Sequence, residues 1–369
     1  MFGKKGILGI DIGSKVIKIL ELNVSGKKVS VTNYAEYDIG SQAVEEKSPE
    51  ERKQAYADSL KRLVSNKKFS TKNAAISVSG SSVIVRFVKF PKMSAGDLEK
   101  TLQFEAEPHI PFDIQEVYLD TQIIRDIEEE EEVKMETVLV ASKKETVQDK
   151  IDIIQAAGFN PKVIDVDAFA VENAYEFMNS GAPGDVVMLI NIGASITNIS
   201  IVENGVSKVV RDLYTAGNSF THAIRELMQN TLEEAEQLKI KYGMLRGAGE
   251  NEGEGGMGEQ VFNIMYPVVK ELNSEIQRSI DYFSGQQAAG GMNIKQIILS
   301  GGSAGMKGLP ELITSDIRIP VSIFSPLKNA DKSSLKDKID VNSPALAVVT
   351  GLALRKAGDN KKAGNTKKK

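Results

Sequence analysis

The sequence contains no cysteine, and histidine occurs only twice, as His109 and His222, among 369 residues. Without cysteine, a disulfide framework and a thiol nucleophile are both excluded. With two histidines we expect no histidine-based metal site. No run of about 18 apolar residues occurs, and the basic N-terminus precedes no long apolar core of a signal peptide, so we expect no membrane span and a cytoplasmic location.

The composition is that of a soluble globular protein, with 41% hydrophobic residues, 26% charged residues and a net charge of −4. This balance carries no electrostatic footprint for nucleic acid, so nucleic acid is not an expected partner. Because a chain of 369 residues exceeds one ordinary hydrophobic core, we expect two or more domains.

A short apolar strand, Ile7–Ile12, runs into a tight turn at Gly13, Ser14 and Lys15 and continues as the second strand of a hairpin. Gly13 has no Cβ, so backbone N–H groups can approach an anion, and the Ser14 hydroxyl and Lys15 ammonium can complete a phosphate cradle. Asp11 can hold magnesium through water, because this ion keeps most of its hydration shell. The alternative is an ordinary hairpin.

The segment Val186–Val202 repeats this plan about 180 residues later. An apolar strand again reaches a small polar residue, Asn191, and is followed by Gly193, a turn that contains Ser195, and Thr197 at the start of another strand. Two such hairpins can grip one nucleotide from opposite sides.

A third glycine turn follows the apolar strand Ile297–Leu299 and precedes a helix that is expected to start near Leu309. Its residues are Gly301, Gly302 and Ser303. The order of the three turns along the chain resembles that of the actin-like ATPase superfamily. This resemblance implies an α/β fold of two lobes, each with a mixed sheet flanked by helices, with ATP and magnesium as cofactors.

In that superfamily the two hairpins are the phosphate loops, and the third turn is the adenosine motif. The segment Thr231–Gly243 resembles the helix whose Glu and Lys meet the ribose, here Glu236 and Lys239. An ordinary surface ion pair is the alternative for this spacing. The segment Asn342–Leu354 resembles the second connecting helix and, from its small residues, is expected to pack closely against another helix.

The segment Asp165–Tyr175 resembles the first connecting segment, where a polar residue often positions the attacking water. Asp167 is therefore the candidate catalytic residue, although a helix N-cap is the simpler role. Asn191 departs from the superfamily, which commonly has Asp at this position beside the magnesium. A neutral amide cannot match the charge of a carboxylate toward magnesium, so we expect ATP binding with slow or absent hydrolysis.

The segment Leu98–Asp120, with a corner at Pro111 and Phe112, resembles the type IV pilus assembly family PilM. This resemblance implies an inserted subdomain like that of the division protein FtsA, and it implies a partner, the cytoplasmic N-terminal segment of a PilN-like inner-membrane protein. The protein would then lie at the inner membrane through that partner. The insert is hypothesised to make a protein contact, and a corner over a local core is the alternative.

The expected domains are a first lobe of residues 1–80 with 163–184 and helix 343–355, an insert of residues 81–162, a second lobe of residues 185–214 and 291–342, and its small subdomain of residues 215–290. Glu128–Glu132 is expected to form a solvated hairpin tip. The segment Arg246–Gln260 is expected to be a mobile loop, and 356–369 a disordered basic tail without an apolar face that could enter a membrane.

Three functions stay open at this stage. The first is a nucleotide-binding scaffold of the pilus machine that resembles PilM. The second is a division or cytoskeletal filament that resembles FtsA or MreB, for which self-association is expected. The third is a phosphotransferase of the sugar-kinase branch, although no convincing sugar-binding pattern is found.

Overall fold

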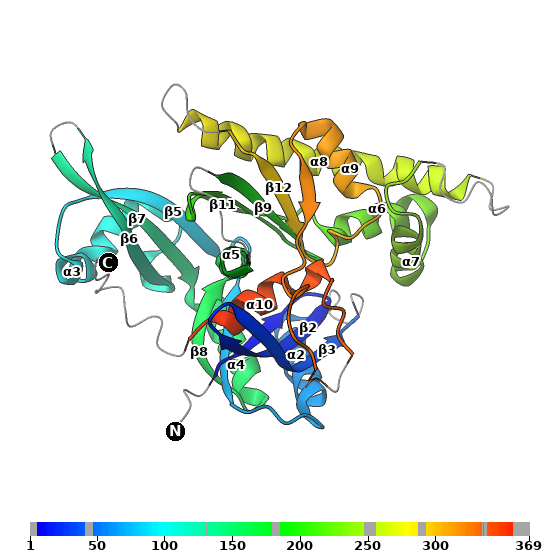
Figure 1. Ribbon diagram of the computed structural model, residues 1–369, viewed down its shortest axis with the longest axis horizontal. Coiled ribbons are helices and arrows are strands. Elements are labelled where there is room, and N and C mark those ends of the chain that lie inside the picture. Colours follow the sequence, from blue (N-terminus) through cyan, green and yellow to red (C-terminus); the bar gives the residue numbers. More distant parts are fainter. Residues whose placement is uncertain are drawn as a thin grey trace.

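The computed structural model describes residues 6–40, 47–129, 132–178, 185–246, 256–286, 293–333, 335 and 338–356. Within these ranges the strands form three sheets, two of which have five strands and one of which has three. Figure 1 shows the two larger sheets on either side of the helices α5 (Asp167–Met178) and α10 (Ala347–Leu354). The smallest sheet stands beside them as a separate layer.

The first lobe is built on a mixed sheet in the order β3-β2-β1-β4-β8. Strands β1, β2 and β3 are antiparallel neighbours, whereas β4 and β8 join β1 in parallel. In these strands Ile, Leu and Val either alternate with polar residues or follow one another without interruption, so the strands bury one face or both faces. Their bounds are β1 Leu8–Ile12, β2 Val16–Ser25, β3 Lys28–Asp38, β4 Asn73–Val78 and β8 Asn160–Val166.

The second lobe repeats this topology in the order β11-β10-β9-β12-β13. Strands β9, β10 and β11 are antiparallel neighbours, and β12 and β13 follow in parallel, as β4 and β8 do in the first lobe. The predicted α/β fold with two mixed sheets is confirmed. The bounds are β9 Val186–Ile192, β10 Thr197–Glu203, β11 Val206–Leu213, β12 Gln296–Ser300 and β13 Val321–Ile323.

Helices α2 (Pro49–Val64) and α4 (Lys144–Ala156) cover the outer face of the first sheet. Ser48 begins α2 with a capping box, since its hydroxyl accepts from the Glu51 N–H and the Glu51 carboxylate accepts from the Ser48 N–H. Ile153 and Ile154 of α4 are buried with the strands of the first sheet. We therefore propose that the insert ends at Lys143 rather than at residue 162.

The inner faces of both larger sheets pack against α5 and α10. These two helices approach so closely that a Cβ on Gly351 would lie 1.7 Å from the carbonyl oxygen of Ala170. The small-residue helix was predicted to pack closely on another helix, and α5 is that helix. The 3-10 turn η4 (Pro344–Leu346) leads into α10.

The insert carries the smallest sheet, in the order β5-β7-β6, with helix α3 on one face. Ser94 caps α3, because its hydroxyl accepts from the N–H of Asp97. The hairpin strands extend to Glu129 and from Glu132, so part of the acidic run that was expected at the hairpin tip is strand. The bounds are β5 Val83–Pro91, α3 Ala95–Ala106, η1 Glu107–His109, η2 Ile114–Glu116, β6 Val117–Glu129 and β7 Glu132–Lys143.

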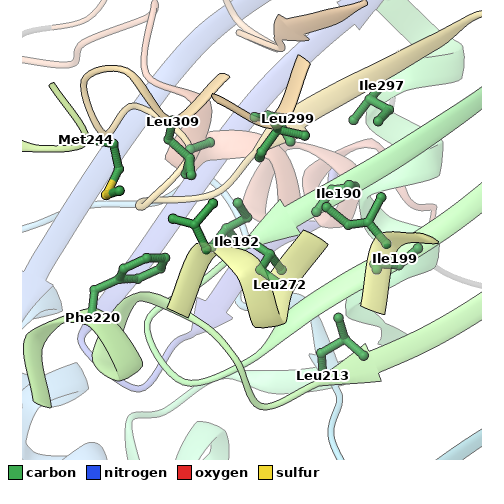
Figure 2. Close-up of a cluster of buried hydrophobic side chains, with 14 of the residues drawn as sticks. Ile190, Ile192, Ile199, Leu213, Phe220, Met244, Leu272, Ile297, Leu299 and Leu309 are labelled. Carbon is green, nitrogen blue, oxygen red and sulfur yellow. The ribbon is translucent and has the colours of Figure 1, made fainter. Parts of the chain in front are cut away.

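Four helices cover the outer face of the second sheet, and Figure 2 shows the core between them. In it Leu272 and Phe220 pack toward Ile190, Ile192 and Ile199 of the sheet. No helix within the described ranges has the length and apolar character needed to cross a bilayer. The bounds are α6 Gly217–Met228, α7 Leu232–Tyr242, α8 Met257–Gly285 and α9 Leu309–Ile317.

Two of the predicted segments consist largely of residues that the structure does not describe. The loop expected over Arg246–Gln260 includes residues 247–255, which are not described, and α8 already begins at Met257. The basic tail expected over 356–369 is described only at Lys356. Both therefore stay predictions.

Candidate functional site

A cleft of about 650 Å³ lies between the two lobes and is lined by both hairpin turns. Of the residues predicted for the nucleotide and magnesium sites, all but Thr197 line it. The lining also includes Lys18 and Lys150, which the sequence analysis missed. The predicted residues found there are Asp11, Gly13, Ser14, Lys15, Asp167, Asn191, Gly193, Ser195, Glu236, Lys239, Gly301, Gly302 and Ser303.

The two hairpin turns have the same local geometry. A Cβ on Gly13 would lie 2.8 Å from the carbonyl oxygen of Val16, and a Cβ on Gly193 would lie 2.7 Å from that of Ile196. Each turn therefore requires glycine, because any side chain would push against the carbonyl three residues later. The predicted repeat of one turn in two lobes agrees with this geometry.

Each turn is flanked by a cross-strand pair at the same register. In the first hairpin Asp11 opposes Lys18, and their side chains form an ion pair of 3.1 Å. In the second hairpin Asn191 opposes Asn198, and the Asn191 amide donates to Asn198 Oδ1 at 2.8 Å. The first hairpin thus presents paired charges to the cleft, and the second presents paired amides.

The amide pair belongs to a hydrogen-bond chain that crosses between the lobes. The Ser300 hydroxyl donates to Asn191 Oδ1 at 3.3 Å, and the Asn198 amide donates to Asp212 Oδ1 at 2.8 Å. The backbone N–H of Gly80, at the end of the first lobe's β4, donates to Asp212 Oδ2 at 2.6 Å. The Asp212 carboxylate therefore ends this chain of hydrogen bonds, and it is connected to the cleft residue Asn191 through the Asn198 amide.

An ion pair also crosses the cleft from the first turn. Lys15 Nζ lies 2.7 Å from Glu236 Oε1, and the other oxygen of Glu236 contacts Lys239 Nζ at 2.6 Å. Thr221 donates to the same carboxylate at 2.6 Å. Burial alone would raise the pKa of Glu236, but Lys239, Lys15 and Thr221 lower it to about 2. Glu236 and Lys239 thus form a buried cluster rather than the surface ion pair that was the alternative.

The third turn, at Gly301 and Gly302, leaves open space on its cleft side. Gly301 has φ +93°, and a Cβ there would lie 2.4 Å from the Ile192 carbonyl oxygen, so this position requires glycine. At Gly302, by contrast, a Cβ would meet no atom within 4 Å. Ser303 donates to the carbonyl oxygen of Gly193 at 3.2 Å, which ties this turn to the second hairpin.

Asp167 is the first residue of α5 and lies within the cleft. Burial and the nearby Asp11 raise its pKa to about 6, although hydroxyls of Ser77 and Ser79 bind the carboxylate and oppose the shift. Lys150, whose ammonium donates to the Ile12 carbonyl oxygen at 2.9 Å, also faces it. Asp167 is therefore held within a group of charged side chains at the cleft, with Asp11 and Lys150 beside it.

Thr197 is the one predicted site residue that the structure places elsewhere. Its side chain is 0% exposed, and its hydroxyl donates to the Thr215 carbonyl oxygen at 2.8 Å. Successive residues of a strand point to opposite faces, so Thr197 turns away from the cleft where Asn198 faces it. The placement of Thr197 in the nucleotide site is therefore corrected, and Asn198 is the cleft residue at this hairpin.

A second, larger cavity of about 1100 Å³ lies between the insert and the two lobes. We call it the insert groove. Its walls are formed by β5, β6 and β7 of the insert, by the end of β8, by the start of β11 with β9 and β10 beside it, by α4 and by one side of α5. Among these strands, β5, β6, β8 and β11 are edge strands of their sheets. Edge strands carry backbone N–H and C=O groups that an extended segment can pair with.

Comparison with known proteins places this geometry in a family. The family model for "Type IV pilus assembly protein PilM" matches residues 9–357. Among solved structures, the "PilM-PilN type IV pilus biogenesis complex" shares 25% identity and a TM-score of 0.80, over 95% of this chain and 98% of that one. MreB5 of Spiroplasma citri bound to AMPPNP has a TM-score of 0.53 and 13% identity, over 94% of each chain, which shows a shared fold.

Among curated proteins, the cell division protein FtsA of Helicobacter pylori is 24% identical over 238 residues. The alignment covers 60% of this chain and 47% of FtsA, so the chain spans about half the length of this relative. The family match, by contrast, covers nearly the whole chain and agrees with the structural match to the complex. The protein belongs to the PilM family of type IV pilus assembly proteins, with an actin-like fold.

Proposed function

We propose that the protein binds ATP with magnesium in the cleft between its lobes and uses the insert groove to hold a PilN-like partner. The observation that carries the proposal is the convergence of residues from four distant segments on one cleft of about 650 Å³. The hairpin residue Lys15 and the α7 residue Glu236 are 221 positions apart in sequence, yet they are in contact.

The residues fit a nucleotide. The turns at Gly13 and Gly193 offer backbone N–H groups, and the ammonium groups of Lys15 and Lys18 supply positive charge for phosphates. The open space over Gly302 provides room for a flat base. Bound magnesium would neutralise phosphate charge, and Asp11 and Asn191 would face it through water.

The residues favour binding over turnover. Asn191 is a neutral amide whose oxygen already accepts from Ser300 and whose nitrogen donates to Asn198. Its contribution to magnesium is therefore weaker than that of a carboxylate. Asp167 would position water but is partly protonated near its pKa of about 6. We expect hydrolysis far below rates of about 10 per second, so that ATP acts mainly by drawing the lobes together.

The nucleotide proposal is tested with Gly302→Val. The new side chain meets open space in the protein alone, so the thermal midpoint without ligand should not fall, but it should exclude a base. Wild-type protein should gain about 2.7 kcal/mol at 100-fold saturation with Mg-ATP. The matched control is Gly6→Val, also at a position with open space but outside the cleft. Full ATP stabilisation of Gly302→Val would remove this turn from the site.

The partner of the related complex is a PilN protein, as its name states. We propose that the cytoplasmic N-terminal segment of a PilN-like inner-membrane protein lies in the insert groove here, and that this contact holds the protein at the inner membrane. The groove suits a peptide because it is long, bounded by edge strands and walled by apolar side chains such as Phe87, Phe169 and Val187.

The partner proposal is tested by fluorescence anisotropy with a labelled peptide of that segment. Gln122, on the groove side of β6, is replaced by Trp to fill the groove, and Gln277→Trp on α8 serves as the matched control. Micromolar binding that Gln122→Trp abolishes and Gln277→Trp preserves supports the proposal. If the wild-type protein does not bind the peptide, with or without Mg-ATP, the partner proposal is wrong. That result would favour the alternative of a filament that resembles FtsA or MreB.

A further inference from the structure

The charges that line the insert groove are strongly unbalanced. Among the described residues that line it, five carry carboxylates, and Arg355 is the single cation. The walls between these charges are mostly apolar, so water screens them less than on an open surface. The carboxylates belong to Asp120, Asp165, Glu172, Glu176 and Asp185.

Two of the carboxylates already have cations of the protein itself. Asp165 lies 3.5 Å from Arg355, and Asp185 is paired with Lys295. In the described part of the chain no ion pair involves Asp120, Glu172 or Glu176. Among the described residues, the groove therefore carries a net negative charge that no cation of its own lining balances at Asp120, Glu172 and Glu176.

Glu172 is the most confined of the three. Ser207 of β11 donates to its Oε2, whereas its Oε1 is buried without a hydrogen-bond partner among the described residues. Burial raises the pKa of Glu172 to about 7, and the neighbouring Asp165 and Glu176 add to the rise, against the hydroxyls of Ser207 and Ser200. A buried acceptor without a donor is unfavourable, and a ligand that brings a donor would relieve it.

We propose that the insert groove selects a positively charged segment, and that Glu172 and Glu176 of α5 receive a Lys or Arg side chain of the bound peptide. Asp120 on the opposite wall, on β6, adds to the same potential. The two glutamates are four residues apart, so they lie one turn from each other on the same face of α5. This inference rests on the proposed function, because it assigns the chemistry of the peptide in that groove.

A cytoplasmic segment next to a membrane span is a natural source of such charge. Cytoplasmic flanks of inner-membrane proteins carry an excess of Lys and Arg. An acidic groove therefore complements the charge of this class of partner. Such complementarity raises the rate at which the two proteins associate, and it fixes the position of the peptide in the groove. The apolar walls then hold the neighbouring side chains of the segment, and selection requires both features together.

The experiment compares two peptides with four proteins. The peptides are the partner's N-terminal segment and the same segment with every Lys and Arg replaced by Met. The proteins are wild type, Glu172→Gln, Glu176→Gln and a control, Glu311→Gln, which removes an exposed carboxylate of α9 outside the groove. We expect the dissociation constant to rise about tenfold for Glu172→Gln and for the Met peptide, and to stay unchanged for Glu311→Gln. Affinity for the wild type should also fall as salt rises.

A second readout separates a charge role from a packing role. A cation binds the ionised carboxylate, so wild-type affinity should rise as pH rises from about 6 to about 8 and then level off. The other groups that face Glu172 are Asp165 with its partner Arg355, Glu176, and the hydroxyls of Ser207 and Ser200. Glu172→Gln should remove most of this pH dependence, because burial raises the pKa of Glu172 to about 7, within this range.

The outcomes distinguish the inference from the function on which it rests. If wild-type protein binds neither peptide at low salt, the partner proposal itself fails. If it binds both peptides equally, with no effect of salt or of the two glutamine variants, the partner proposal stands and the selection of charge is wrong. Glu176→Gln guards against misfolding, because this side chain is exposed and its replacement leaves no buried gap.

Discussion

Replacing Asn191 by Asp tests why this chain departs from its superfamily. Asp212 fixes the direction of the hydrogen bonds that run from it through Asn198 to Asn191. An ionised carboxylate can only accept, so the amide nitrogen of Asn198 must donate to Asp212. The Asn198 oxygen then faces position 191, which must supply an N–H. Asn at position 191 is therefore required by the carboxylate at position 212.

The cost of Asn191→Asp follows from this polarity. Either the new carboxylate faces Asn198 Oδ1, or Asn198 turns over and its oxygen faces Asp212. Each arrangement leaves two buried acceptors in contact without a proton, which costs about 1–3 kcal/mol and more when the groups are charged. We therefore expect a loss of about 3 kcal/mol, or a fall of roughly 4 °C in the thermal midpoint of unfolding for a chain of 369 residues.

The second substitution, Asp212→Asn, should rescue the first. In the double variant the amide oxygen introduced at position 212 accepts from the Gly80 N–H, and its nitrogen donates to the Asn198 oxygen. The Asn198 nitrogen in turn donates to the carboxylate introduced at position 191. All links are restored with the opposite polarity, so the double variant should unfold within about 1 kcal/mol of wild type. Asp212→Asn alone should also be mild, because the same reversed chain can end with Asn191 donating to the Ser300 hydroxyl.

The assay is thermal unfolding of the four proteins, read as a double-mutant cycle. Two effects that simply add, so that the double variant is no more stable than Asn191→Asp, would refute the proposed polarity of the chain. The double variant also moves a carboxylate into the cleft. If the nucleotide proposal is correct, its stabilisation by ATP should depend more strongly on magnesium than that of the wild type.

Three further predictions concern the cleft and the helices behind it. Asp167→Asn should flatten the dependence of stability on pH. Burial and Asp11 raise the pKa of Asp167 from 3.8 to about 6, so its carboxyl group stabilises the fold fully below about pH 4, and this contribution falls as pH rises through about 6. The total loss in the wild type reaches about 3 kcal/mol at about pH 7.5, measurable by denaturant unfolding. Gly351→Ala should lose about 3 kcal/mol or more, since its Cβ would lie 1.7 Å from the Ala170 oxygen, whereas Gly285→Ala, in open space, should not. Lys15→Met should cost about 1.5 kcal/mol without ligand, because Lys239 and Thr221 still contact the Glu236 carboxylate, yet it should abolish stabilisation by Mg-ATP. Lys72→Met, outside the cleft, should change neither in a thermal-shift assay.

The turns of the cleft could be predicted because their chemistry is local. Gly13 and Gly193 stand in short patterns of strand, small polar residue and glycine, and the required absence of a Cβ is a property of the turn itself. The cap at Ser94 is local in the same way. Thr197 lies one residue away from the residue that lines the cleft. Asn198 pairs directly with Asn191 across the hairpin, so its side chain lies on the same face of the sheet, and counting from Asn191 would have indicated Asn198.

The remaining cleft residues depend on contacts between distant segments. Lys18 is revealed only by the register that sets it opposite Asp11. Lys150 reaches Ile12 from a helix 138 residues away, and Asp212 reaches Gly80 across 132 residues. No spacing in the sequence encodes such contacts, because they arise from how whole lobes pack. The boundary of the insert, which we propose at Lys143, depends on such contacts too, since the apolar residues of α4 suit either neighbouring core.

Helix α5 joins the two sites that this protein is proposed to use. Its first residue, Asp167, lines the cleft, and Glu172, five residues later, lines the insert groove, which at 1.5 Å per residue places them only about 7.5 Å apart along the helix. Because Gly351 lets α10 pack closely against α5, we expect the two helices to move together as one rigid body. A nucleotide that shifts α5 must then change the groove, and by thermodynamic reciprocity a bound segment must change the affinity for the nucleotide by the same factor.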